Sequence, residues 1–176
     1  PAKVAADALA RGELVAWVNG PSEWGPRALG HRSVLARPDS EAIRDALNRR
    51  IKGREVFRPF APALLDAQAR TILVDAPNDM TPRMTTTCEV VEGAELAGCT
   101  HVDGTARAQT VDGDGVFAGL LRTLEEAHGI RGVLNTSLNV AGEPMVAVET
   151  DALDFLVRRK PDALMIEDGW IRRPST

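Results

Sequence analysis

The sequence predicts an α/β protein with a mixed sheet. Two observations lead to this class. Segments with the length and apolar content of strands alternate along the chain with segments of helical character, and no repeat or low-complexity linker separates them. In addition, 44% of the 176 residues are hydrophobic and 26% are charged, which is enough apolar material for a real core. We therefore expect residues 1–176 to form a single domain.

In the first half of the chain, breaking and capping residues mark where the elements begin and end. Helix formers run up to Arg11 and are followed by Gly12, a short apolar run stops at Asn19, and Ser40 can cap a helix. The expected elements are a helix at 3–11, strands at 14–18 and 33–36, a helix from 39 or 40 to 51, and a strand at 61–65. Residues 66–100 carry weak signals, and there we expect only short mixed elements and loops.

The second half of the chain gives clearer signals. Gly129 can end one helix and Thr150 can begin another. The expected elements are a strand at 105–111, a helix at 115–128, a strand at 132–134, a short strand at 145–148, a helix at 150–159, and a terminal hairpin with strands at 163–167 and 170–172.

Composition and charge argue against several classes of protein. A net charge of −4 and a pI near 5.4 are not those of a general nucleic-acid binder. The two cysteines, Cys88 and Cys99, provide neither a disulfide framework nor a metal-binding spacing, which favours a cytoplasmic location. No apolar run is long enough to span a bilayer, and Asp7 and Arg11 interrupt the segment that a signal peptide would need. The chain begins with Pro1 instead of methionine, so we expect a piece of a longer protein.

A basic run stands out in this acidic chain. Residues 44–58 contain six cations and two acids, a formal charge of +4, whereas the whole chain carries −4. Arg58 at the end of this run is followed by Pro59, Phe60 and Pro62. Because proline fixes the backbone, we expect the Arg58 guanidinium to be partly buried and held in place for an anionic ligand.

The other cations of this run divide into two groups. Lys52, Arg54 and Arg58 follow the predicted helix and would project to one side of an extended segment, which suits a polyanion such as a triphosphate. Arg49 and Arg50 lie in the last helical turn, where cations commonly interact with the helix dipole. We expect these two arginines to face solvent.

Three other segments carry polar groups suited to an anionic or nucleotide ligand. The loop at 25–33 contains two glycines and two arginines, and it can present guanidinium and backbone N–H groups to a phosphate. The strand predicted at 105–111 would place three polar side chains on one face, and small polar side chains follow the strand predicted at 132–134. The candidate side chains are Arg27 and Arg32, then Thr105, Arg107 and Gln109, and finally Asn135, Ser137 and Asn139.

Each of these segments also has a plainer explanation. Loop arginines are commonly solvated, and polar side chains on one strand face can point to water. His101 and Asp103 could form a metal pair, but two ligands two residues apart are weak support. Ser137 lacks the glycine-flanked elbow of a serine nucleophile, and no Walker-type loop is present, so arginines would have to hold any phosphate.

Taken in order, these motifs resemble the C-terminal domain of the O-carbamoyltransferases that modify antibiotics and nodulation factors. The resemblance covers roughly residues 13–165. His31 stands where the family more often has asparagine, and residues 66–100 are only loosely similar. The motifs are Glu23 with Gly-Pro-Arg-Ala-Leu-Gly at 25–30 and Arg32-Ser33; Lys-Gly-Arg-Glu at 52–55 with Phe-Arg-Pro-Phe-Ala-Pro at 57–62; His101 with Asp-Gly-Thr-Ala-Arg at 103–107 and Gln-Thr-Val at 109–111; and Leu-Asn-Thr-Ser at 134–137 with Asn139 and Gly-Glu-Pro at 142–144.

The resemblance implies both a fold and a reaction. The fold would be a twisted α/β sheet similar to the nucleotide-binding domain of threonylcarbamoyl-adenylate synthases. The enzyme would combine ATP, as its Mg²⁺ complex, with carbamoyl phosphate to give carbamoyl-adenylate, pyrophosphate and phosphate. A preceding domain, absent from this chain, would hold iron and pass the carbamoyl group to a hydroxyl acceptor. Neither a membrane nor a nucleic acid is an expected partner.

We therefore expect a three-sided cationic cavity, and two other functions stay open. The expected catalytic residues are Arg27, Arg58 and Arg107, of which Arg58 is the first choice. No side chain is expected to bind a metal. The alternatives are a nucleotide- or RNA-binding module without turnover and a hydrolase of carbamoyl or acyl phosphate. The expected nucleotide-binding residues are Lys52, Arg54, Arg58, Thr105, Asn135, Ser137 and Asn139.

Overall fold

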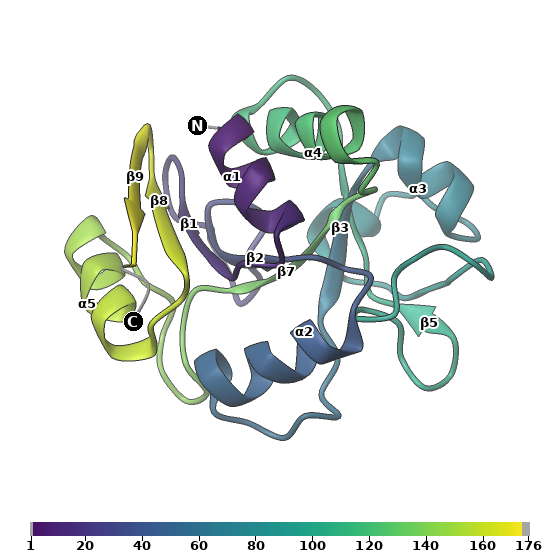
Figure 1. Ribbon diagram of the computed structural model, residues 1–176. Helices are drawn as coiled ribbons and strands as arrows, with labels where there is room; N and C mark the ends of the chain where they lie inside the picture. Colours follow the sequence, from purple (N-terminus) through teal and green to yellow (C-terminus); the bar gives the residue numbers. More distant parts are fainter. Residues whose placement is uncertain (1, 174–176) are drawn as a thin grey trace.

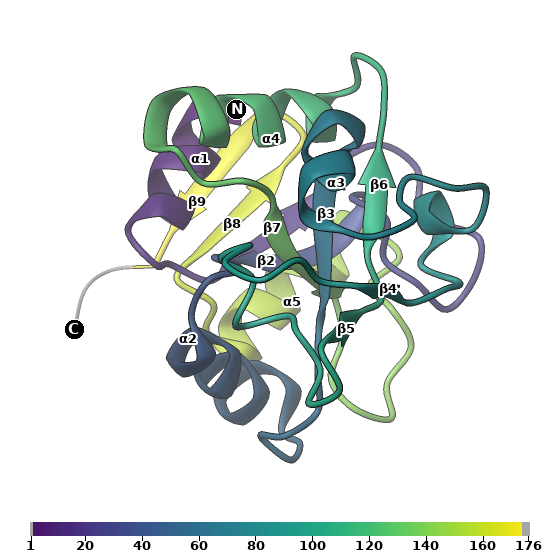
Figure 2. The same cartoon turned by 90° about the vertical axis from the view of Figure 1, so that its right-hand side faces the viewer.

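The computed structural model describes residues 2–173, and its centre is a seven-stranded sheet (Figures 1 and 2). Two neighbouring pairs, β1–β8 and β3–β6, are parallel, and the other pairs are antiparallel. The prediction of an α/β fold with a mixed sheet is confirmed. In spatial order the strands are β6 (Gln109–Val111), β3 (Ala61–Leu65), β7 (Val133–Ser137), β2 (Arg32–Ala36), β1 (Val15–Val18), β8 (Ala163–Ile166) and β9 (Gly169–Arg172).

Helices cover both faces of this sheet (Figure 1). One face carries α1 (Ala2–Ala10) and α4 (Val116–His128), and the other carries α2 (Glu41–Ala46), its continuation η1 (Leu47–Lys52), and α5 (Glu149–Arg159). Strand β1 is therefore buried on both sides: Val15 and Trp17 pack toward α1 and α4, whereas Ala16 and Val18 pack toward the opposite helices. A strand covered on both faces must be apolar throughout, which explains this unbroken apolar run. None of the helices in the described chain combines the length and apolar character that crossing a membrane requires.

Residues 66–100, whose sequence signals are weak, form a small subdomain beside the sheet. Its elements are α3 (Asp66–Ile72), the 3-10 turn η2 (Thr81–Arg83), and β4 (Cys88–Glu89), which pairs with β5 (Thr105–Ala106). Helix α3 and strand β4 contribute side chains to a third apolar cluster that includes Leu64, Ile72 and Leu96. Because α3 has only seven residues and β4 only two, neither contains enough periods of its pattern to be recognised in the sequence.

Two of the predicted strands are wrong. The strand expected at 105–111 is broken: β5 pairs with β4 in the small sheet, whereas β6 pairs with β3 in the large one. Thr105, Arg107 and Gln109 therefore do not share one strand face. The strand expected at 145–148 is irregular backbone, in which Val146 donates one hydrogen bond to Leu138 and buries its side chain in the core. The remaining predicted elements are present, although β7 continues to Ser137.

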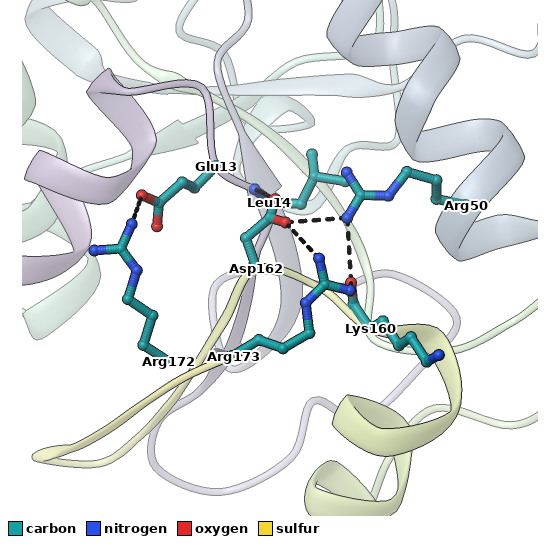
Figure 3. A network of polar contacts seen from close by, with 7 residues as sticks. All are labelled: Glu13, Leu14, Arg50, Lys160, Asp162, Arg172 and Arg173. Carbon is teal, nitrogen blue, oxygen red and sulfur yellow. Dashed lines mark hydrogen bonds and ion pairs between the residues drawn. The ribbon is translucent and has the colours of Figure 1, made fainter. Parts of the chain in front are cut away.

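A polar clasp around Asp162 holds the C-terminal hairpin to the rest of the fold (Figure 3). The Asp162 carboxylate accepts hydrogen bonds from the Leu14 backbone N–H at 2.9 Å, from Arg50 at 3.0 Å and from Arg173 at 3.5 Å. Arg50 and Arg173 also donate to the Lys160 carbonyl, at 3.2 and 3.1 Å. The Arg50 side chain is 43% exposed, as expected, and it also forms an ion pair with Asp162. The clasp thus joins η1 to the ends of α5, β1 and β9.

Candidate functional site

Segments far apart in the sequence enclose one pocket above the carboxyl end of β7. They are the loop between β1 and β2, the segment between η1 and β3, and the segment between β5 and β6. The pocket measures about 460 Å³ with its open mouth, and β7 lines it with residues 135–137. Its apolar surface comes mainly from Pro26, Pro59, Phe60 and Met84, and its charge comes from Arg27, Arg54 and Arg107.

These three arginines, called here the pocket arginines, lack acidic partners. Arginines elsewhere in residues 2–173 commonly pair with carboxylates, whereas no ion pair in this part of the chain includes Arg27, Arg54 or Arg107. The Nε of Arg107 is buried without a hydrogen-bond partner. Burial lowers the pKa of Arg54 and of Arg107, and nearby cations lower both further. Arg58 and Arg107 act on Arg54, where the charge of Glu55 opposes them in part, and Arg27 acts on Arg107. Cations held together without counterions are the arrangement expected of an anion-binding site.

Lys52 lies behind the pocket wall and is only 3% exposed. Its ammonium donates to the backbone carbonyls of Ser137 and Asn139, at 2.5 and 3.1 Å, and to their side-chain oxygens, at 3.1 and 3.0 Å. Desolvation lowers the pKa of Lys52 to about 7, and the positive charge of Arg54 contributes. Lys52 thus ties η1 to the segment after β7, and direct phosphate binding by its ammonium stays a prediction.

The loop that carries Arg27 is fixed from within. The Glu23 carboxylate accepts hydrogen bonds from the backbone N–H groups of Leu29, His31 and Arg32, at 2.7, 2.9 and 3.1 Å. Arg32 is only 5% exposed, and its guanidinium donates to backbone carbonyls, the shortest bond being 2.8 Å. Arg32 therefore serves the loop's structure, and Arg27 is the arginine of this loop that reaches the pocket.

Buried amides connect this loop to the sheet. Asn135 is 1% exposed, and its Nδ2 donates to the Ala28 carbonyl at 3.1 Å and to Gln109 Oε1 at 2.8 Å. Gln109 in turn donates to the Leu29 carbonyl at 2.9 Å. Asn135 is a predicted site residue with two functions: it lines the pocket from β7, and it holds the loop that carries Arg27.

Thr105 and its neighbours form a turn beside the pocket. The Thr105 hydroxyl donates to Asp103 at 2.8 Å and lies 3.1 Å from His101 Nδ1. Desolvation lowers the pKa of His101, and Arg107 lowers it further against the opposing effect of Asp103. Within residues 2–173, no three His, Cys, Asp or Glu side chains gather as a metal-binding group. Nucleotide binding by Thr105 stays a prediction.

The prediction that the Arg58 guanidinium is partly buried is wrong. Arg58 is exposed, and its neighbour Phe57 is 77% exposed; only Phe60 of this segment packs into the core. The prolines therefore shape a surface turn and do not bury the guanidinium. Arg58 lies near enough to Arg54 to lower its pKa, so its predicted role in phosphate binding remains open to test. Arg49, with 66% of its side chain exposed, faces solvent as expected.

Sequence reasoning missed Met84 as a pocket residue. Met84 follows η2 in the left-handed conformation, with φ of 54°, and its side chain is 3% exposed at the pocket wall. It belongs to the segment with the weakest sequence signals, and a lone methionine before a threonine run gives no indication of a binding role.

The chain is similar to known proteins over nearly its whole length. A family model described as carbamoyltransferase C-terminus matches residues 6–173. The chain is 37% identical over 182 residues to nodulation protein NolO of Bradyrhizobium diazoefficiens, covering 99% of the chain and 33% of NolO. It is 38% identical over 168 residues to the 3'-hydroxymethylcephem-O-carbamoyltransferase of Streptomyces clavuligerus, covering 94% of the chain and 32% of that enzyme. The chain thus spans about a third of the length of these curated relatives.

A solved structure of full-length HypF, in a phosphate- and nucleotide-bound form, has the same fold. It superposes with a TM-score of 0.66 at 19% sequence identity, over 94% of this chain and 20% of the HypF chain. Likeness at this level of identity shows the fold alone.

Proposed function

This chain belongs to the carbamoyltransferase family, whose C-terminal domain it matches over residues 6–173, and we propose that its pocket joins carbamoyl phosphate and ATP as carbamoyl-adenylate. The observation that carries the proposal is the convergence of Arg27, Arg54 and Arg107, without acidic partners, on one pocket. Phosphate oxygens would supply the acceptor that the buried Nε of Arg107 lacks. Further support comes from a relative named for O-carbamoyl transfer and from a structural neighbour solved with phosphate and nucleotide.

The proposed reaction needs no protein nucleophile, because water and a carbamate oxygen are the attacking groups. Atom balance requires one water, because phosphate and pyrophosphate both leave while a single new bond to phosphorus forms. Water cleaves carbamoyl phosphate to carbamate and phosphate, and a carbamate oxygen then attacks the α-phosphorus of ATP and expels pyrophosphate. Both steps bring anions together, so catalysis depends on positioning and on cationic stabilisation of the developing charge.

Each part of the site has a role in this proposal. Arg27 and Arg107 bind the carbamoyl phosphate or the α-phosphate, and Arg54 binds the triphosphate. The polar side chains at the end of β7, Asn135 and Ser137, contact the nucleotide, and Asn139 assists through its bond to Lys52. Arg58, which is exposed and close to Arg54, attracts the polyphosphate by its charge.

The proposal extends to partners that the chain itself does not contain. Mg²⁺ would accompany ATP, bound by the phosphate oxygens, where it neutralises their charge. Because the chain spans about a third of its relatives, we propose that a preceding domain receives the carbamoyl group and transfers it to a hydroxyl acceptor. ATP and carbamoyl phosphate are cytoplasmic metabolites, so we place the reaction in the cytoplasm.

Incubation with ATP, Mg²⁺ and carbamoyl phosphate tests this function. We expect pyrophosphate and carbamoyl-AMP to form together, and we expect neither when carbamoyl phosphate is omitted. Phosphate release that is not accompanied by pyrophosphate or carbamoyl-AMP when ATP is present would indicate a hydrolase. ATP binding without release of phosphate or pyrophosphate would indicate a binding module. A fusion of the chain to the remaining two thirds of a relative such as NolO provides the matched full-length sample. Absence of pyrophosphate from both the chain and the fusion would refute the proposal.

A further inference from the structure

Asn48 lies on η1, with its side chain fully buried, and it is not among the residues that line the pocket. η1 is a π-helix, a form often found at functional sites, and it ends at Gly53 in the left-handed conformation with φ of 61°. The Asn48 carbonyl accepts hydrogen bonds from the backbone N–H groups of both Gly53 and Arg54. The helix therefore ends by turning Arg54 back over Asn48.

The Asn48 side chain engages both of its N–H groups and its oxygen with the segment that follows. Its Nδ2 donates to the Val56 and Arg58 carbonyls, both at 3.1 Å, and its Oδ1 accepts from Arg54 Nε at 2.7 Å. An asparagine side chain with both N–H groups and its oxygen engaged at full burial has a single orientation. Asn48 thus fixes both the backbone around Arg58 and the guanidinium of Arg54.

Arg54 is held on its other sides as well. Its Nη2 donates to the Pro59 carbonyl at 3.3 Å, and its guanidinium carbon lies 4.6 Å from the centroid of the Phe60 ring. Its Nη1 has no hydrogen-bond partner within residues 2–173, although the side chain lines the pocket. The contacts to Asn48, Pro59 and Phe60 hold the Arg54 guanidinium in one orientation and leave N–H groups, including those of Nη1, to bind a ligand.

We propose that Asn48 is a positioning residue for the phosphate-binding arginine Arg54. By accepting from Nε, it orients the guanidinium plane so that the remaining N–H groups meet a phosphate oxygen, which lowers the cost of ordering a long side chain on binding. This inference rests on the proposed function, because it assigns Arg54 to the triphosphate of ATP.

A spectroscopic measurement tests the positioning without any ligand. In the wild-type chain, the Arg54 Nε–H resonance, assigned by its loss in Arg54→Ala, should exchange slowly with water because its acceptor is buried. In Asn48→Ala it should exchange rapidly, while in Ile51→Val, a control on the same helix that lowers the melting temperature, it should stay slow. If the resonance stays slow in Asn48→Ala, Asn48 does not hold Arg54 and the proposal is overturned.

A double-mutant cycle on ATP affinity then tests the functional consequence. We expect Asn48→Ala to weaken ATP binding about 10- to 100-fold, the range for a hydrogen bond to a charged group, and to have less than about a twofold effect when Arg54 is already alanine. Ile51→Val should leave the affinity unchanged. Equal losses in both backgrounds would overturn the proposal, because Asn48 would then act independently of Arg54.

Two further readouts keep the test decisive. If Asn48→Ala does not fold, Asn48→Asp replaces it: the carboxylate keeps an acceptor for Arg54 Nε, so the slow resonance should remain, and its disappearance would overturn the proposal. A wild-type chain with the slow Arg54 resonance but no affinity for ATP would count against the proposed function, whereas fast exchange in the wild type would count against the role of Asn48.

Discussion

Replacing Arg107 with methionine separates the stability of the fold from the affinity of the pocket. Arg107 has a buried Nε with no hydrogen-bond partner, and both burial and Arg27 lower the pKa of its guanidinium. An unsatisfied buried donor costs about 1–3 kcal/mol, and we take the low end because the rest of the guanidinium is only partly buried. Methionine covers similar apolar surface without that cost, so the ligand-free variant should be more stable by about 1 kcal/mol, or roughly 2–4 °C in melting temperature.

The same substitution should weaken the site. A phosphate oxygen that bonds the buried Nε loses a charge-assisted partner, and removal of one such donor costs on the order of 100-fold, or about 3 kcal/mol. Thermal unfolding with and without Mg·ATP measures both effects: Arg107→Met should melt higher without ligand and gain less from it than the wild type. The control is Arg122→Met, which removes a half-exposed arginine that pairs with Asp114 and the Gly113 carbonyl outside the pocket, and it should change neither quantity by a comparable amount. A lower melting temperature without ligand, or an unchanged gain with ATP, would refute the role given to Arg107.

Three further outcomes follow from the contacts around the pocket and the clasp. The pKa of Lys52 is about 7 in the folded chain and 10.5 ordinarily, so between these values the unfolded chain binds more protons than the folded chain. The free energy of unfolding should therefore rise with pH across that window. Urea unfolding at pH 7 and 9 should show this rise for the wild type and not for Lys52→Met. Asp162→Ala should lower the free energy of unfolding by about 1–3 kcal/mol, because the Leu14 N–H loses its acceptor and two guanidinium groups keep only the Lys160 carbonyl. ATP affinity should stay unchanged, and a loss of stability below about 0.5 kcal/mol would mean that the clasp is not stabilising. In Glu23→Ala, three backbone N–H groups of the loop that carries Arg27 lose their acceptor. Amide hydrogen exchange in this loop should therefore be faster, and ATP binding should be about 10-fold weaker. Exchange at the wild-type rate would contradict the role given to Glu23.

Much of the fold could be predicted because its elements carry strong local signals. The apolar run of β1 and the helix ended by Gly129 are examples, and both lie where the sequence places them. The break at residues 107–108 could not be predicted, because a strand that leaves one sheet and enters another keeps the same extended backbone and alternating pattern. The small subdomain at 66–100 depends on contacts between short segments, which no single segment encodes.

Residue type was a better guide to which side chains line the pocket than to how they are placed. Arg27, Arg54, Arg107, Asn135 and Ser137 do line one pocket, and their roles there stay predictions. The strand face that Thr105, Arg107 and Gln109 were expected to share does not exist. Local sequence could not tell which cation of the basic run points inward.

The difference between two of these cations shows why. Contacts with Asn48, Pro59 and Phe60 together hold the Arg54 side chain at the pocket. Arg58 was the first choice for a buried phosphate-binding residue because of its flanking prolines, but it lies on the surface. Burial of a charged side chain is a property of the assembled fold, so flanking residues are a poor guide to it.

The most direct test of the central claim is a crystal structure of this chain with Mg²⁺ and a non-hydrolysable ATP analogue. We expect phosphate oxygens within hydrogen-bond distance of Arg27, Arg54 and Arg107 together, with Arg54 still hydrogen-bonded to Asn48. An analogue bound elsewhere, with the three pocket arginines still without an anionic partner, would contradict it.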